Sequence, residues 1–243
     1  MRSSMDEWGP LSLKFGKTKA SMQETGISTS PTMATGNTLS LVAKDIACVR
    51  GGRTVFEGVS FAVQAGEALM LRGPNGTGKS SLLRLLAGYV PVAEGTLLWC
   101  GEDAHDDLEG YQLNLHYLGH LDAIKPVLSV RENISQWAAL MGAEADADEA
   151  LAHFGLAKLA DLPAKYLSAG QKRRLNLARL AASHRPIWLL DEPSVSLDDA
   201  SVAQLEKLVA KHLGEGGMAI IATHLDLDVG PASVLRLGEG GAS

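Results

Sequence analysis

The chain is poor in cysteine and in long apolar runs, and it has no excess of basic charge. Its only two cysteines, Cys48 and Cys100, form no C-x-x-C pair, which predicts reduced thiols and no cysteine-based metal site. No stretch approaches the roughly 18 apolar residues of a membrane-spanning helix. The net charge of −6 argues against a nucleic-acid-binding surface.

The composition indicates one α/β domain with an appendage. With 46% hydrophobic residues in 243, the chain can build a core. We predict the domain over residues 38–243. Residues 1–37 are rich in Ser, Thr, Gly and Met without periodicity, which predicts a flexible N-terminal extension. The N-terminus lacks the apolar stretch of a signal peptide, and a translation start at Met33 stays open.

The strongest motif lies between an apolar run predicted as a buried strand and a stretch predicted as a helix. It matches G-x-x-x-x-G-K-[ST], with Lys79 to reach the β- and γ-phosphates of a nucleotide and the Ser80 hydroxyl to ligate Mg²⁺. Glycines let successive N–H groups face a phosphate, and the helix N-terminus adds positive potential. The residues predicted to bind ATP here are Gly73, Pro74, Asn75, Gly76, Thr77, Gly78, Lys79, Ser80 and Ser81.

A second motif is predicted to begin a helix. Ser168 and Gln171 have the spacing of a capping box, and an apolar stripe follows. The basic run 172–174 is predicted as a solvated face of this helix. The motif consists of Leu167, Ser168, Ala169, Gly170 and Gln171.

A third motif is an apolar strand, residues 187–190, that ends in two acids. Asp191 is predicted to hold magnesium through water, and Glu192 to orient or polarise an attacking water. A helix is predicted over 199–213. The run 218–222 is predicted as the last core strand, and His224 follows it, where ligands of parallel sheets bind.

The remaining elements are predicted from alternation, capping and turn residues. The predicted strands are 39–43, 46–49, 59–63 and 95–101, an exposed acidic loop covers 102–109, and helices run from Ser129 to about Met141 and over 144–155.

Taken in this order, the motifs resemble those of ABC-type ATPases, the nucleotide-binding subunits of ATP-binding cassette transporters. The resemblance covers the chain from about Thr38 to its end. It implies an α/β fold with a P-loop NTPase core, an antiparallel β subdomain and an α-helical signature subdomain at roughly 125–183. It also implies hydrolysis of ATP with Mg²⁺, with Asp198 in the D-loop and His224 as the switch histidine. A second copy would form a head-to-tail dimer, placing ATP between one copy's phosphate loop and the other's signature.

Two positions depart from the pattern of that family. Where most members carry a glutamine that senses magnesium and contacts the membrane partner, this chain has His120. A histidine can donate and accept like an amide but titrates near neutrality, so we expect activity to fall on the acid side. Where most carry an aromatic residue that stacks on adenine, this chain has Arg50, whose guanidinium can also stack on a base.

The segment from Gly119 to Lys125 and the stretch from Phe56 to Phe61 resemble the ATP-binding subunit of the cytochrome c maturation system, often called the haem exporter. This resemblance implies a peripheral subunit on the cytoplasmic side of a bacterial inner membrane. It would dock to integral membrane permease subunits, couple ATP hydrolysis to haem delivery, and bind no nucleic acid. Three alternatives stay open: an ABC ATPase for another transported substrate, a soluble ABC ATPase that assists assembly, and a small-molecule kinase.

Overall fold

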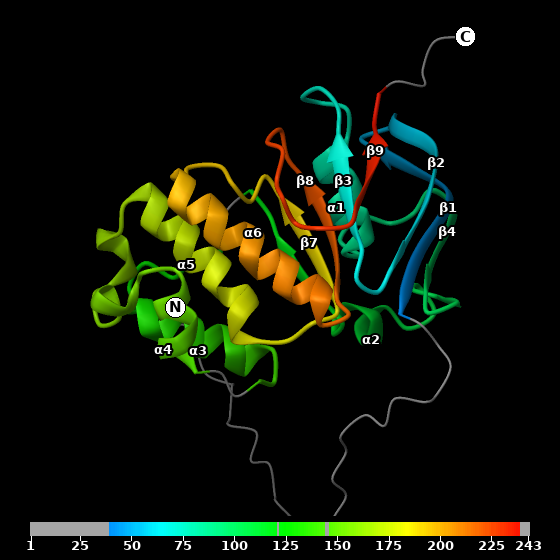
Figure 1. The fold of residues 1–243 in the computed structure, drawn as a ribbon. Helices are drawn as coiled ribbons and strands as arrows, with labels where there is room; N and C mark the ends of the chain where they lie inside the picture. Colours follow the sequence, from blue (N-terminus) through cyan, green and yellow to red (C-terminus); the bar gives the residue numbers. More distant parts are fainter. Residues whose placement is uncertain (1–38, 121, 144–145, 239–243) are drawn as a thin grey trace, which may run out of the picture. The chain divides into compact units, whose positions relative to one another are not determined.

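The computed structural model describes residues 39–120, 122–143 and 146–238. The predicted N-terminal extension and the alternative start at Met33 lie outside these residues. Within them the chain forms one antiparallel sheet and one parallel sheet, with helices on both faces of the parallel sheet (Figure 1). The predicted α/β fold class is confirmed.

The antiparallel sheet has the strand order β2-β1-β4-β5. Its strands are β1 (Ser40–Arg50), β2 (Arg53–Gln64), β4 (Glu94–Trp99) and β5 (Glu102–Asp103). The two segments predicted at 39–43 and 46–49 are one strand, because a register shift at Asp45, with φ 49°, bends β1 without ending it. The turn between β1 and β2 consists of Gly51 and Gly52, which both have positive φ.

The parallel sheet has the order β6-β7-β8-β3-β9, and every neighbouring pair in it is parallel. Its strands are β3 (Ala68–Arg72), β6 (Leu115–Leu118), β7 (Ile187–Asp191), β8 (Met218–Ala222) and β9 (Ala232–Arg236). The prediction that 218–222 is the last core strand was wrong, because β9 pairs with β3 beyond it. All five C-terminal ends therefore meet at one edge, which carries the phosphate loop after β3 and the acidic end of β7.

Alternate residues of the parallel strands feed two separate apolar clusters. Ile187 and Leu189 pack with α1 (Lys79–Leu86) and the antiparallel sheet. Trp188 and Leu190 pack on the opposite face, against the helical side. Figure 1 shows α1 on one face of the parallel sheet and α6 (Asp199–Gly214) on the other. Helices therefore cover both faces of the sheet and support the edge at which the strands end.

The helical region comprises α3 (Val130–Leu140), α4 (Ala147–His153), η1 (Ala157–Leu159), η2 (Ala164–Tyr166) and α5 (Ala169–Ala182). The predicted start of a helix at Ser129 is confirmed, since Ser129 and Glu132 form a capping box at the start of α3. The helix predicted over 144–155 is shorter, because Asp146 caps α4 and the helix ends before Phe154, which is fully buried. None of the helices in the described part of the chain has the length and apolar character needed to cross a membrane.

The acidic stretch predicted as an exposed loop is partly regular. Residues Glu102–Asp103 form β5, and Asp107 caps the short helix α2 (Leu108–Gln112) by accepting a hydrogen bond from Gly110. Tyr111 of that helix is buried and donates to the Leu86 carbonyl at the end of α1. Most of the acids of this stretch are exposed, whereas Ala104 is buried and α2 packs its aromatic side chain against the core.

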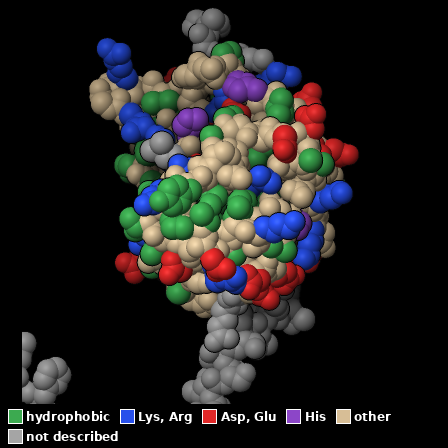
Figure 2. Space-filling model, turned by 90° about the vertical axis from the view of Figure 1, so that its left-hand side faces the viewer, with side chains coloured by type: hydrophobic (Ala, Val, Ile, Leu, Met, Phe, Trp, Pro, Cys, Tyr) green, Lys and Arg blue, Asp and Glu red, His purple; other side chains and the backbone are tan. Residues whose placement is uncertain are grey.

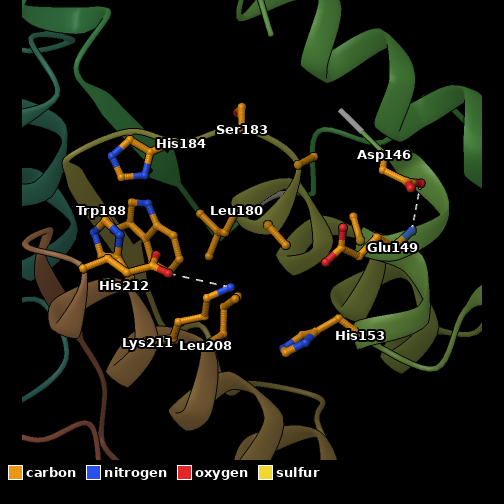
Figure 3. A pocket seen from close by; sticks show the side chains of 14 residues that line it. Asp146, Glu149, His153, Leu180, Ser183, His184, Trp188, Leu208, Lys211 and His212 are labelled. Carbon is orange, nitrogen blue, oxygen red and sulfur yellow. Dashed lines mark hydrogen bonds and ion pairs between the residues drawn. The ribbon is translucent and has the colours of Figure 1, made fainter. Parts of the chain in front are cut away.

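A pocket lies on the helical side of the parallel sheet, between α4, α5 and α6. Figure 3 shows Trp188 and His212 lying flat against each other at its wall, and their rings are 3.8 Å apart and nearly parallel. His212 bonds to the Met218 carbonyl, and burial lowers its pKa to about 4.

A second buried histidine, His116, lies on β6. It contacts the Ser183 carbonyl and hydroxyl, and burial lowers its pKa to about 4 as well.

These two buried histidines predict acid sensitivity of the fold. Because their folded pKa lies below the unfolded value, the unfolded state binds more protons as the pH falls from about 6.5 toward 4, and stability falls with it. We expect the urea-measured free energy of unfolding to drop by about 2 kcal/mol per histidine between about pH 7 and about pH 5. His116→Gln keeps a hydrogen-bond donor for Ser183 but does not titrate. Its free energy of unfolding should therefore fall less than that of the wild type over the same pH range. An unchanged pH dependence in His116→Gln would contradict this assignment.

Candidate nucleotide site

The loop between β3 and α1 is wrapped around the ammonium group of Lys79. Lys79 Nζ donates to the Gly73 carbonyl at 2.6 Å and to the Pro74 carbonyl at 3.1 Å, and its side chain is almost fully buried. Thr77 Oγ1 also donates to the Pro74 carbonyl, at 3.0 Å. The Lys79 ammonium is thus held by backbone carbonyls of the loop at the N-terminus of α1. Because a helix N-terminus also favours negative charge, this position suits a bound phosphate.

Two positions of this loop require glycine, both because φ is positive and because a Cβ atom would collide with neighbouring atoms. Gly73 has φ +141°, and a Cβ on it would collide with the Leu237 carbonyl. Gly78 caps α1 at φ +101°, and a Cβ there would lie 2.9 Å from Val55 and 3.0 Å from the Phe56 ring. The loop therefore packs against β2 of the antiparallel sheet at Gly78 and against the residue that follows β9 at Gly73, both positions that only glycine can occupy.

The acidic end of β7 meets the start of α1. Ser80 Oγ donates to Asp191 Oδ1 at 3.0 Å, although 111 residues separate them. Asp191 is 2% exposed, and its second oxygen, Oδ2, is buried without a partner among the described residues. A hydroxyl beside a carboxylate with one buried free oxygen is a donor set that suits Mg²⁺, which binds hard oxygen ligands.

Glu192 and His224 lie together at the same edge. His224 Nε2 is 3.2 Å from Glu192 Oε1 and 3.0 Å from Asn75 Oδ1, so the imidazole joins the acid to the phosphate loop. Glu192 has φ 47°, while its N–H still donates to the Ala222 carbonyl at 2.7 Å. A non-glycine residue in this left-handed region is uncommon and costs strain, which the surrounding contacts must hold.

The second motif begins α5 as predicted. Gln171 N–H donates to Ser168 Oγ at 3.2 Å, and Ser168 N–H donates to Gln171 Oε1 at 2.8 Å, which completes the capping box. Leu167 is buried and Ser168 is exposed. The helix N-terminus therefore presents its hydroxyl and amides to the outside.

The predicted D-loop touches this motif. A Cβ on Gly170 would lie 3.0 Å from the Ser196 carbonyl, and Ser196 has φ 67°. Asp198 caps α6 by accepting from Ser201 N–H at 2.9 Å, and these hydrogen bonds lower the pKa of Asp198. The phosphate loop and the signature line different hollows of the chain: Gly73 and His224 line one, and Ala169 and Ser196 line the other.

The two departing positions lie apart from each other. His120 lines the signature-side hollow with Ala169 and Ser196. Arg50 is exposed at the end of β1, opposite Arg53, whereas Val55 and Phe56 of β2 reach the phosphate loop. Sequence reasoning missed these two residues because the alternation of β2 does not show which face meets the loop.

The prediction that the run 172–174 forms a solvated helix face was wrong for its central residue, Arg173. Arg173 is 4% exposed, and its guanidinium contacts the backbone at the acidic end of β7. Neighbouring Arg174 donates to the Phe154 carbonyl and is half-buried. The basic run by itself does not predict the burial of Arg173, because carbonyl groups that bind its guanidinium belong to residues 191–193, outside α5.

The fold and this edge define a P-loop nucleotide hydrolase with a helical signature region. The family model for ABC transporters matches residues 56–195. The chain belongs to this family, as an ABC-type ATPase.

Relatives and a solved structure agree with that family. The chain is 54% identical over 202 residues to the "Cytochrome c biogenesis ATP-binding export protein CcmA" of Paramagnetospirillum magneticum, covering 81% of this chain and 93% of that protein. It is 49% identical over 203 residues to the protein of the same name from Paracoccus denitrificans, covering 84% and 91%. A solved "ATP binding subunit of ABC transporter" has a similar fold, with a TM-score of 0.73 at 22% identity over 81% of this chain and 87% of that one.

Proposed function

We propose that this chain is the ATP-hydrolysing subunit of a membrane complex that couples ATP hydrolysis to haem export or delivery for c-type cytochromes. The observation that carries the proposal is the phosphate loop joined to Glu192 through His224, in a chain about half identical to proteins named for cytochrome c biogenesis. The geometry supports the hydrolysis, and the relatives' name supports the cellular role.

Each residue at the edge has a role in this proposal. Lys79 would leave the Gly73 and Pro74 carbonyls and bind the β- and γ-phosphates, whose oxygens are stronger acceptors. Glu192 would accept the proton of the attacking water. His224 Nε2, which contacts Asn75 and lies beside that carboxylate, would donate its proton to the γ-phosphate in place of Asn75 when ATP is bound.

Magnesium fits beside these residues. Ser80 would ligate it, and Asp191 would hold it through water with the buried Oδ2 that has no partner among the described residues. When bound, the ion would neutralise charge on the phosphates.

Asp191→Asn should therefore raise the magnesium concentration needed for half-maximal ATPase activity by roughly 10–100-fold, as is typical when a group that orients a metal ligand is lost. The reason is that an amide replaces the free anionic oxygen while the bond to Ser80 can persist. The measurement is a magnesium titration at fixed ATP, with Asp199→Asn, on the exposed first turn of α6, as the control. An unshifted titration would exclude Asp191 from the metal site.

A second copy would complete the nucleotide site. Ser168 presents an exposed helix N-terminus that lines a hollow other than the one beside Gly73. A head-to-tail dimer would bring one copy's signature to the other copy's γ-phosphate, where helix amides stabilise negative charge. His120 lies beside that signature, and we propose that it takes the position of the family's usual glutamine there.

An apolar groove is proposed to receive the permease subunits. It lies between the core and α3, and Tyr89 and Leu113, which are 61% and 66% exposed, line it together with Trp137. Large exposed apolar side chains gathered in one groove are typical of a protein interface. On the helical side of the chain, Figure 2 shows basic and acidic side chains interspersed along the lower part of the view, below a group of hydrophobic side chains.

The test is affinity purification of the chain from mildly solubilised membranes of its own bacterium, followed by identification of bound proteins. Co-purification of integral membrane proteins needed for c-type cytochromes supports the proposal. Permeases for another substrate would assign the chain to a different transporter, and purification without membrane proteins would favour the soluble assembly factor. Transfer of phosphate to a small-molecule acceptor, instead of release of free phosphate, would indicate a kinase.

A further inference from the structure

Arg173 is buried at a point where three parts of the site meet. From α5, its guanidinium reaches the backbone immediately after β7: Nη2 donates to the Glu192 carbonyl at 2.6 Å and to the Asp191 carbonyl at 3.1 Å. Its Nε donates to the Pro193 carbonyl at 3.2 Å. One side chain of the signature helix thus holds three consecutive carbonyl groups of the acidic segment.

The remaining nitrogen of Arg173 holds the loop that follows β6. Nη1 donates to the Gly119 carbonyl and to Asp122 Oδ1, both at 3.3 Å. These two residues flank the position of His120 in the sequence. The same guanidinium therefore fixes both the acidic segment and the His120 loop relative to α5.

Only arginine has the geometry for this task. Its planar fork carries five N–H donors, whereas a lysine ammonium is a single point with three. Glu192 is held at φ 47°, which the chain does not adopt without support. The bonds of Arg173 to the carbonyls on either side of this strained residue provide that support.

A chain of hydrogen bonds continues from Arg173 to the surface groove. Asp122 Oδ1 also accepts from Asn176 Nδ2 at 2.8 Å, and Asn176 Oδ1 accepts from Arg179 Nη1 at 2.6 Å. The Arg179 guanidinium lies over the Trp137 ring, 3.3 Å from its centroid. Trp137 and Arg179 line the groove between the core and α3, so the groove and the acidic segment are joined by side chains in direct contact.

We propose that Arg173 is a positioning residue for ATP hydrolysis and that it transmits movement of the groove to the acidic segment. Its guanidinium holds Glu192 and the His120 loop in one arrangement. The contacts through Asp122, Asn176 and Arg179 make that arrangement depend on Trp137. This inference rests on the proposed role of Glu192 in hydrolysis.

The first test replaces Arg173 with lysine and with methionine in the full chain. A misplaced acid slows the chemical step without removing the phosphate contacts, so kcat should fall roughly 10–100-fold while the equilibrium Kd for ATP changes about twofold or less. Because lysine keeps the charge but not the fork, it should not rescue kcat. The matched control is Arg174→Met: from the same helix, that guanidinium donates to the Phe154 carbonyl, which lies outside the acidic segment.

The second test is a double-mutant cycle on kcat, combining Arg173→Lys with Trp137→Leu. If the contacts transmit movement, the two effects are not additive, and the double variant is no slower than Arg173→Lys alone. Thermal unfolding of each variant is measured alongside, because a purely structural role would lower the melting temperature and leave the kcat of the folded protein unchanged. Normal kcat in Arg173→Lys, or additive effects in the cycle, would overturn the proposal.

The Glu192→Gln variant separates this inference from the proposed function. If Glu192→Gln hydrolyses ATP normally, the role of Glu192 fails whatever Arg173 does. If Glu192→Gln is inactive and Arg173→Lys is normal, only the positioning role of Arg173 fails.

Discussion

Glu192→Gln is expected to bind ATP but to hydrolyse it about 100-fold more slowly or worse, the magnitude typical of losing a general base. Glutamine keeps the size of the side chain and can still accept a hydrogen bond from His224, which lies 3.2 Å from Oε1. It cannot take a proton from water. The measurements are release of phosphate and equilibrium binding of ATP on the same preparation.

In the proposed head-to-tail dimer, hydrolysis would be the step that separates the two copies, so the same variant should accumulate an ATP-bound dimer. Size-exclusion chromatography with light scattering should show a dimer with ATP and a monomer without it. Glu206→Gln is the control, since that carboxylate lies on α6 and accepts a surface hydrogen bond from Asp228 N–H. A Glu192→Gln chain that stays monomeric with ATP and turns over normally would show that Glu192 is not the base.

Lys79→Ala is expected to lose most of its ATP affinity. A hydrogen bond to a charged group contributes about 1.5–3 kcal/mol, so Kd should rise roughly 10–100-fold. The loop also loses the ammonium that binds the Gly73 and Pro74 carbonyls, which leaves its amides less well ordered for a phosphate. Binding is measured by calorimetry with a slowly hydrolysed ATP analogue.

Lys207→Ala removes an exposed lysine of α6 and should bind ATP like the wild type. Circular dichroism of Lys79→Ala should match the wild type, which separates lost affinity from lost fold. Near-normal affinity in Lys79→Ala would contradict the assignment of the phosphate loop.

The nucleotide edge could be predicted from sequence because each of its parts is local. A phosphate loop needs a strand, glycines and a helix N-terminus in one contiguous stretch, and residues 68–86 contain them all. The capping box at Ser168 and the acids after β7 are equally local. Parallel strands then bring the phosphate loop and the acids of β7 to one edge, which is why Ser80 meets Asp191 across 111 residues.

What sequence did not predict depends on long-range pairing. The strand β9 is mostly exposed and lies at the edge of the sheet, so it lacks the apolar run that revealed β8. The strand β6 has only four residues, one of them His116, and was not recognised as a strand. Neither strand forms from its own pattern, because β3 and β7 supply their hydrogen-bond partners.

The burial of Arg173 likewise could not be predicted from sequence, because it depends on residues far from α5 in the chain. Within 172–174 all three residues are basic, and on a helix such a run is usually solvated. The carbonyl groups that bind Arg173 come from Gly119 and from residues 191–193. No local signal in α5 reveals acceptors that lie so far away in the chain.

In the proposed function, ATP hydrolysis at this edge is required for making c-type cytochromes. The most direct measurement is haem covalently attached to c-type cytochromes, seen by haem staining of membranes, in cells whose only copy of the gene encodes the wild type, Glu192→Gln or Glu206→Gln. Equal amounts of each protein are verified by immunoblot. We expect normal staining with the wild type and Glu206→Gln and none with Glu192→Gln. Normal staining with Glu192→Gln, or in cells that lack the gene, would contradict the account.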